Sequence, residues 1–445
     1  MSSINLKKNI MMGGSARLII MILAFFSSWI SARYLGVELK GQYSYLVTMG
    51  SFIWMVLDLG LYHSYPYLIR KSPGKVNNLF GWSVLTFLAE TILLCAIGLI
   101  LINFWSRALG FDFNPVYMLA FVALVTLRKF FMQMQSLYLG LDKIWLHSIG
   151  QLINSATFLL LILLGYLLLR GADRLAWVLG AVLIGLSASI MFFMCRHHWD
   201  LSFRKLDLGY VFSSYKFGIR VFISALLISL MIRADILLIR YFLDFSQVGI
   251  YSISAHVVDL LQAASNVVGG MLLVKLSDTA DDLGKWIVMR KMLLLFFVFL
   301  TAANLGFLML GRFVLAILYG AEFVPAYPVY LWLIPASYGL SFGSLFNNYL
   351  NSKGFPVITI VIAGLALAVN IGLNLLLIPL WGIKGAALTT SVSYLLWFIL
   401  IIAWEQKQTG GKMLKHLVPD KGDWLEVRET LAQVLAKARQ QLHRH

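Results

Sequence analysis

Apolar stretches long enough to cross a lipid bilayer recur along nearly the whole chain. A helix needs roughly 20 mostly apolar residues to span the hydrocarbon core of a membrane. Stretches of this kind lie at 9–32, 42–64, 79–104, 116–139, 147–169, 175–194, 218–241, 247–272, 286–311, 326–351, 356–379 and 384–404. They are too long for barrel strands and lack the alternation of period two that barrel strands show. The sequence therefore predicts an all-α integral membrane protein with about twelve transmembrane helices.

The shortage of charge excludes a water-soluble fold. Only 13% of the 445 residues are charged and 60% are hydrophobic, whereas soluble proteins carry about 25% charged residues. The net charge is +16, yet most basic residues lie between apolar stretches and form no stripe with aromatics on a polar surface. We therefore expect no nucleic-acid partner.

No soluble catalytic motif occurs in the sequence. It has no phosphate-binding P-loop, no Gly-x-Ser-x-Gly and no metal-binding histidine cluster. The two cysteines, Cys95 and Cys195, lie far apart in or beside apolar segments, which is typical of packing residues. We expect a protein that is not an enzyme and that has no cofactor and no metal site.

Basic residues in the connections between helices predict the topology. The odd-numbered connections carry Arg33, Lys40, Arg107, Arg170, Arg174, Arg240, Arg312 and Lys384. The even-numbered connections carry the larger set, namely Arg70, Lys71, Lys75, Arg128, Lys129, Lys143, Arg196, Arg204, Lys205, Lys216, Lys275, Lys285, Arg290, Lys291 and Lys353. Cytoplasmic loops carry the excess of Lys and Arg. We therefore expect the even connections and both termini to lie in the cytoplasm.

A polar interruption near the middle predicts two halves. We expect an N-terminal six-helix bundle over 1–195, a cytoplasmic linker over 196–217, a C-terminal six-helix bundle over 218–404 and a cytoplasmic tail over 405–445.

The outer hairpin that opens each half carries a similar pattern. Arg33-Tyr34-Leu35 precedes Gly41-Gln42-Tyr43-Ser44, and Arg240-Tyr241-Phe242 precedes Gly249-Ile250-Tyr251-Ser252. An even number of helices per half makes this a parallel repeat, and paired halves are a common transporter plan with the substrate site between them.

The tail has apolar residues at helical spacing. They are Trp424, Val427, Leu431, Val434, Leu435, Ala438 and Leu442. This spacing predicts a short amphipathic helix that lies on the inner leaflet or docks a partner; a frayed polar tail remains the alternative.

Charged side chains inside the apolar stretches are the best pointers to a site, because each costs about 2.5–3.5 kcal/mol in a membrane unless it faces a cavity or a partner. Arg17 and Arg220 lie near the cytoplasmic ends of the helices that open the two halves. Facing each other, they would form a cationic cup, and guanidinium binds phosphate as a bidentate fork. The alternative is that both extend to the interface and bind ordinary phospholipid.

The other charged residues have both functional and structural interpretations. Arg233 either lines a cavity or makes a structural ion pair, and Asp235 pairs with another helix because residues two apart on a helix do not face each other. Glu90 and Asp259 lie nearest mid-membrane, where a carboxylate takes up a proton or sodium ion or pairs with an arginine. Asp58 either serves ion coupling or has a structural role at a helix bend in Asp58-Leu59-Gly60-Leu61.

Histidines and helix-breaking residues add two weaker signals. His63 and His256 are expected to be packing residues. Prolines and glycines crowd the stretches at 326–351 and 356–379, where kinks could serve alternating access.

Four ordered motifs resemble the Wzx-type polysaccharide flippases of the multidrug, oligosaccharidyl-lipid and polysaccharide exporter superfamily. They are Ala32-Arg33-Tyr34-Leu35-Gly36 with Gly41-Gln42-Tyr43; Asp58-Leu59-Gly60-Leu61; Arg233-Ala234-Asp235-Ile236 continuing to Val248-Gly249-Ile250-Tyr251-Ser252; and Asn374-Leu375-Leu376-Leu377-Ile378-Pro379 with Gly382-Ile383-Lys384-Gly385-Ala386-Ala387. The resemblance spans roughly residues 10–404. One departure is that the arginine of the seventh-helix pair, Arg233, precedes Asp235, whereas the family has the reverse order.

The resemblance implies a V-shaped pair of six-helix bundles like that of multidrug exporters, around a central cavity. It implies an undecaprenyl-diphosphate-linked oligosaccharide, such as an O-antigen repeat of lipopolysaccharide, moved across the bacterial inner membrane by exchange with H⁺ or Na⁺. Other membrane proteins of polysaccharide assembly are then candidate partners. A multidrug exporter of the same superfamily and a membrane sugar polymerase remain the alternatives.

Overall fold

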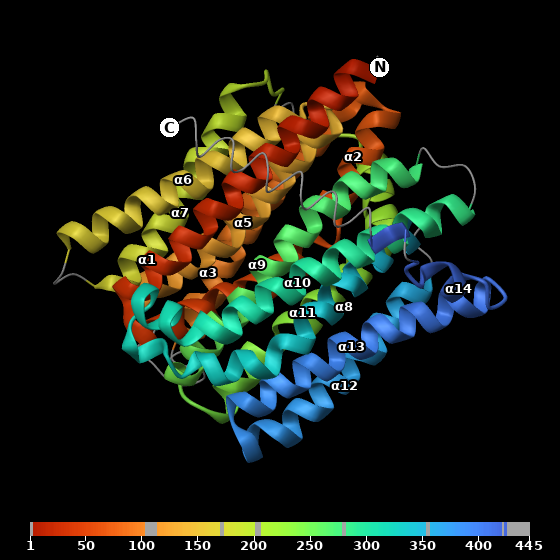
Figure 1. The fold of residues 1–445 in the computed structure, drawn as a ribbon. Coiled ribbons are helices and arrows are strands. Elements are labelled where there is room, and N and C mark those ends of the chain that lie inside the picture. The colour runs from red at the N-terminus through yellow and green to blue at the C-terminus, as the bar shows by residue number, and fades with distance from the viewer. Residues whose placement is uncertain are drawn as a thin grey trace, which may run out of the picture.

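The structure is a computed structural model that describes residues 3–102, 114–169, 173–200, 206–277, 282–352, 357–420 and 422–424. Its elements are α1 (Ser3–Asp58), α2 (Leu61–Lys71), η1 (Pro73–Lys75), α3 (Val76–Ile100), α5 (Pro115–Gly140), α6 (Ile144–Leu168), α7 (Arg174–Cys195), α8 (Leu208–Phe242), α9 (Phe245–Ser277), α10 (Asp282–Leu318), η3 (Ala321–Phe323), α11 (Ala326–Ser352), α12 (Val357–Trp381), α13 (Ile383–Gln408) and α14 (Met413–Leu417). In Figure 1, α6 and α7 lie at one flank and α12 and α13 at the opposite flank. The predicted all-α membrane fold is confirmed.

The helix α1 contains two membrane passes. Its backbone is helical on both sides of Gly36, where φ is 74° and ψ is 179°, a conformation that glycine adopts at little steric cost. Ten described helices are long and apolar enough to cross a membrane, and the first of them, Ala16–Asp58, holds both arms of α1. Together with α9, which has 33 residues, these helices account for the expected number of passes.

Two helix boundaries differ from the sequence prediction. The predicted helix 42–64 is broken at Leu59 and Gly60, whose φ values are 48° and 81°. The helix α8 begins at Leu208 rather than at 218, so residues 208–217 of the predicted linker are helical. The reason is a cap: Asp207 Oδ1 accepts a hydrogen bond of 3.0 Å from the backbone N–H of Tyr210, which satisfies a free helix donor.

The predicted amphipathic helix of the tail lies outside the described residues, apart from Trp424. What precedes it is docked on the membrane helices. Met413 is fully buried, and Arg290 of α10 donates a hydrogen bond of 3.0 Å to Asp423. Met413 and Asp423 therefore anchor this part of the tail to the membrane helices.

Buried apolar side chains form two large clusters. One joins α2, α3, α5, α6 and α7, and the other joins α8 to α13 together with Ala32 of α1 and with α14. We propose that these clusters are the cores of two bundles, with α7 ending the first and α8 opening the second.

The two copies of the sequence repeat, one in α1 and one at the start of α9, meet at the end of the molecule remote from the N-terminus. A Cβ atom on Gly41 would lie 1.8 Å from the carbonyl oxygen of Phe245, and one on Gly249 would lie 2.0 Å from that of Val37. Arg33 Nε also donates a hydrogen bond of 2.7 Å to the carbonyl of Leu318 at the end of α10. This end is therefore closed by backbone contact between α1 and α9, which we call the glycine seam.

Candidate functional site

Three adjoining cavities lie between α1, α5 and α6 on one side and α8, α9, α11 and α13 on the other. Their volumes are about 850, 270 and 340 Å³. Arg233, His256 and Asp259 line both of the first two, and Lys40 and Tyr43 line both of the last two. Because neighbouring cavities share walls, we treat them as one space and call it the chamber.

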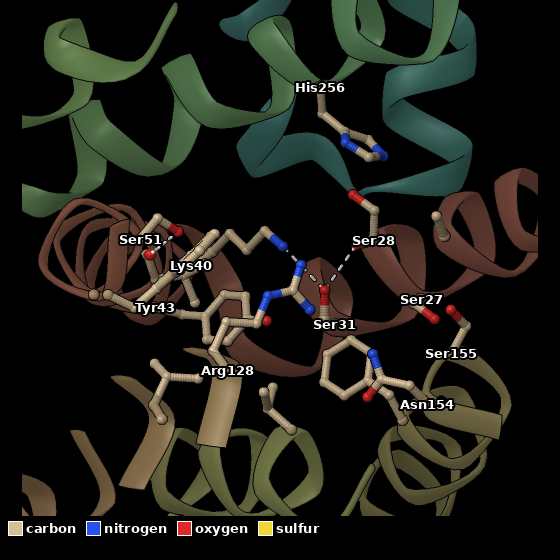
Figure 2. Close-up of a pocket in the computed structure, with 17 residues that line it drawn as sticks. Ser27, Ser28, Ser31, Lys40, Tyr43, Ser51, Arg128, Asn154, Ser155 and His256 are labelled. Carbon is tan, nitrogen blue, oxygen red and sulfur yellow. Dashed lines mark hydrogen bonds between the residues drawn. The ribbon is translucent and has the colours of Figure 1, made fainter. Parts of the chain in front are cut away.

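Two cations from different helices enter the chamber on the α1–α5 side. Lys40 is 7% exposed, and its ammonium donates a hydrogen bond of 3.0 Å to Ser31 Oγ. Arg128 comes from the middle of α5, and Figure 2 shows that Lys40 and Arg128 point to the same space around Ser31. His256 faces this space from α9.

The chamber continues toward α8 and α9 with an ion pair. Arg233 Nη2 lies 2.7 Å from Asp259 Oδ2. Arg17, exposed on α1, lines the same cavity as this pair. The sequence predicted that Arg233 would not pair with Asp235, two residues away on the same helix. Arg233 pairs instead with Asp259 of α9.

The walls of the chamber carry more positive than negative charge. The cations that line it are Arg17, Lys40, Arg128 and Arg233, and Asp259 is the carboxylate among its lining residues. Several hydroxyl groups complete the wall, including those of Ser27, Ser28, Ser51 and Ser155. Unpaired cations inside lipid are costly, so this composition suits an anionic guest.

The predicted cationic residues fall in two places. Arg17 and Arg233 line the chamber, whereas Arg220 is exposed on α8 and is not among the residues that line the three cavities. The structure thus groups Arg17 with Arg233. A cup made by Arg17 and Arg220 stays a prediction without support from this geometry.

The predicted ion-coupling carboxylates have four different surroundings. Asp259 pairs with Arg233, and Glu90 pairs with Lys129 of α5 rather than with an arginine. Asp58 accepts hydrogen bonds from Gln133 Nε2 at 2.8 Å and from the backbone N–H of Tyr62 at 3.1 Å. It therefore caps α2 at the helix break.

Asp235 is the fourth carboxylate and lies on α8 away from the chamber lining. It is 2% exposed, and it accepts hydrogen bonds from the hydroxyls of Tyr251 and Thr390 and from the backbone N–H of Ile236. Among the described residues it has no ion-pair partner. The motif residues Asp235 and Tyr251 are thus direct neighbours.

The sequence prediction missed Lys40, Arg128 and Lys129 as site residues because it counted them as connection residues. Arg128 and Lys129 instead lie inside α5, and Lys40 is buried in the second arm of α1. The sequence did contain a signal for Arg128 and Lys129, because both lie inside the predicted helix 116–139.

Residues 6–274 match the family model described as polysaccharide biosynthesis protein. The chain belongs to this family. The match covers more than half of the 445 residues. The resemblance stated from the four motifs is thereby confirmed at the level of the family.

Solved structures of transporters share the fold. The lipid II flippase MurJ in an inward closed conformation is similar with a TM-score of 0.67 and 14% identity, over 94% of this chain and 90% of that one. A multidrug transporter of the MATE family, inward-facing, is similar with a TM-score of 0.66 and 11% identity, over 90% and 99%. At these identities the likeness concerns the fold.

A curated relative is an uncharacterized membrane protein, MJ1068, of Methanocaldococcus jannaschii. It is 37% identical over an alignment of 107 residues, and the match covers 22% of this chain and 20% of the relative. The chain therefore spans about a fifth of the length of that relative.

Proposed function

We propose that this protein carries a polyprenyl-diphosphate-linked oligosaccharide from the cytoplasmic to the outer leaflet by alternating access. The observation that carries the proposal is the excess of cations in a chamber lined by membrane helices. A diphosphate supplies the negative charge that these side chains lack, and charge-assisted hydrogen bonds are about twice as strong as neutral ones.

Arg128 and Lys40 are the residues that we assign to the diphosphate. Both point to the space around Ser31, and neither makes an ion pair with a described carboxylate. Arg233 already has Asp259 as its partner, so it competes less well for an anion. Arg17 lines the largest by volume of the three cavities of the chamber, where it would meet the charged head group on entry.

The glycine seam sets the direction of access in this conformation. Because α1 and α9 touch at the end remote from the N-terminus, a guest enters the chamber from the N-terminal side. With both termini in the cytoplasm, as the basic connections predict, that side is the cytoplasmic one. We propose the cytoplasmic (inner) membrane of a bacterium as the location.

We propose Asp235 as the coupling site for H⁺ or Na⁺. Glu90 and Asp259 are neutralised by Lys129 and Arg233, and Asp58 caps a helix. Asp235 is a buried carboxylate with oxygen-bearing neighbours, Tyr251 and Thr390, and such groups suit a proton or a hard cation. Protonation or cation binding at α8 would favour one arrangement of the two bundles.

A cation-coupled drug exporter is the second candidate, because multidrug transporters share this fold. An exporter of cationic drugs needs an acidic, aromatic chamber, whereas Asp259 is the carboxylate in this lining and is already paired. A sugar polymerase remains a weaker candidate, and among the described residues no carboxylate pair lies free on the chamber wall.

Reconstitution tests the proposal. The purified protein is placed in liposomes with a fluorescent undecaprenyl-diphosphate-linked oligosaccharide, and movement between leaflets is scored with and without a proton or sodium gradient. Accelerated movement supports the proposal. No movement, together with export of cationic dyes by the same liposomes, would favour the drug exporter.

A further inference from the structure

A second large cavity adjoins the chamber on the N-terminal side of the molecule. It has a volume of about 790 Å³ and lies between α2, α8 and α11. Ile228 and Asn347 line both this cavity and the chamber. We call it the side cavity, and we treat it as open to the chamber through these shared walls.

An exposed aromatic pair dominates one wall of the side cavity. The rings of Tyr67 on α2 and Phe217 on α8 are stacked, with centroids 4.6 Å apart and planes at 3°. Tyr67 is 52% exposed and Phe217 is 37% exposed, and both line the cavity. Aromatic faces of this kind bind the apolar faces of flat or ring-shaped ligands.

Polar atoms without partners occupy the inner walls. Asn347 is 8% exposed, and its Oδ1 has no hydrogen-bond partner among the described residues. The same holds for Nε2 of His63, which also lines the cavity. Buried polar atoms are nearly always hydrogen-bonded, and each one left unpaired costs free energy. A ligand that brings hydroxyl groups would satisfy both.

The charge of the side cavity differs from that of the chamber. Arg70 at its rim is already paired with Asp142 at 3.0 Å, which leaves Lys71 as the other cation of the lining. The aromatic pair, the amide and the imidazole favour a neutral polyhydroxylated ring over a second phosphate.

We propose that the side cavity binds a pyranose ring of the saccharide whose diphosphate occupies the chamber. This inference rests on the proposed function and adds the position of the sugar. The sugar is covalently joined to the diphosphate, and the two cavities adjoin, so one molecule occupies both. Binding of the sugar is then intramolecular and raises the overall affinity of the protein for the lipid-linked saccharide.

The test compares two lipids on the purified full-length protein by native mass spectrometry. One is undecaprenyl diphosphate, and the other is the same lipid carrying an oligosaccharide. We expect the wild-type protein to bind the glycosylated lipid about tenfold more tightly. Tyr67→Ala should remove this preference while leaving the affinity for undecaprenyl diphosphate unchanged, and Tyr67→Phe should keep it.

Matched variants separate the possible failures. Tyr241→Ala, which removes a tyrosine of α8 that is 79% exposed and is not among the residues lining the side cavity, should keep the preference. Equal binding of the two lipids by the wild type, or equal weakening of both by Tyr67→Ala, would overturn the sugar site. Failure to bind either lipid would overturn the proposed function itself.

Discussion

Arg128 shows how one residue decides between two descriptions of this chain. As a connection residue it would bind lipid head groups, but in the middle of α5 it lines a lipid-enclosed chamber. A guanidinium there is tolerable because an anion or a fixed countercharge accompanies it.

We expect Arg128→Ala to reduce transport of the lipid-linked saccharide about 10- to 100-fold, because a hydrogen bond to a charged group contributes about 1.5–3 kcal/mol. Initial transport rates in liposomes measure this loss. Arg128→Lys should lose less, since the charge remains but the bidentate fork is gone.

Arg17 and Arg220 provide a direct contrast between sequence and structure. The sequence predicts that Arg17→Ala and Arg220→Ala both impair transport while leaving membrane insertion intact. The chamber geometry predicts loss for Arg17→Ala, which lines it, and near wild-type rates for Arg220→Ala. Equal losses of transport in the two variants would support the cationic cup of Arg17 and Arg220 that the sequence predicts.

Asp235→Asn tests coupling at a single side chain. The amide cannot bind a proton at neutral pH and binds Na⁺ weakly, so we expect transport to become independent of the ion gradient while the affinity for lipid is retained. Gradient-dependent uptake and lipid binding are measured on the same preparation. If transport by Asp235→Asn still responds fully to the gradient, Asp235 is not the coupling site.

At the scale of elements, α3 and α5 are joined by the Glu90–Lys129 pair. Lys129 is 2% exposed and Glu90 is 16% exposed, so Glu90→Gln leaves a buried ammonium without its countercharge. We expect a loss of about 3–5 kcal/mol in stability, seen as a lower unfolding temperature in detergent. The double variant Glu90→Gln/Lys129→Met should recover most of it; if it does not, the pair is not what stabilises this contact.

The tail segment is an element whose docking depends on pH. The backbone N–H of Asp423 and the Arg290 guanidinium lower the pKa of Asp420. Its contribution to docking is therefore present above the ordinary pKa of about 4 and is lost as the pH falls below it. We expect Arg290→Ala to release the segment at neutral pH, detected as faster proteolysis before Trp424; unchanged proteolysis would contradict the docking.

The long helices were predictable because an apolar stretch has one stable form in lipid. At Asp58 the sequence predicted a bend but not the full break at Leu59 and Gly60, because hydropathy continues through these residues and the left-handed backbone appears only in the structure. The chamber was predicted in outline through Arg17 and Arg233. Lys40 and Arg128 were missed because both were counted as connection residues: Lys40 lies between two predicted stretches, and Arg128 lies inside the stretch 116–139.

At the scale of the whole molecule, the glycine seam holds α1 against α9. A methyl group on Gly41 or Gly249 would overlap a backbone oxygen of the other helix. We therefore expect Gly41→Ala to separate the ends of the two bundles and favour the opposite opening. A cysteine placed at Ser28 on the chamber wall should then react with an impermeant reagent from the outer side; unchanged reactivity would show that the seam is not the gate.

Binding of the charged head group tests the central claim most directly. Undecaprenyl diphosphate and uncharged undecaprenol are offered to the purified protein, to Arg128→Ala and to a Lys40→Met variant, and bound lipid is quantified. The cationic chamber predicts strong binding of the diphosphate, little binding of undecaprenol, and weakened diphosphate binding by both variants. Equal retention of the two lipids, or variants that bind the diphosphate as the wild type does, would contradict it.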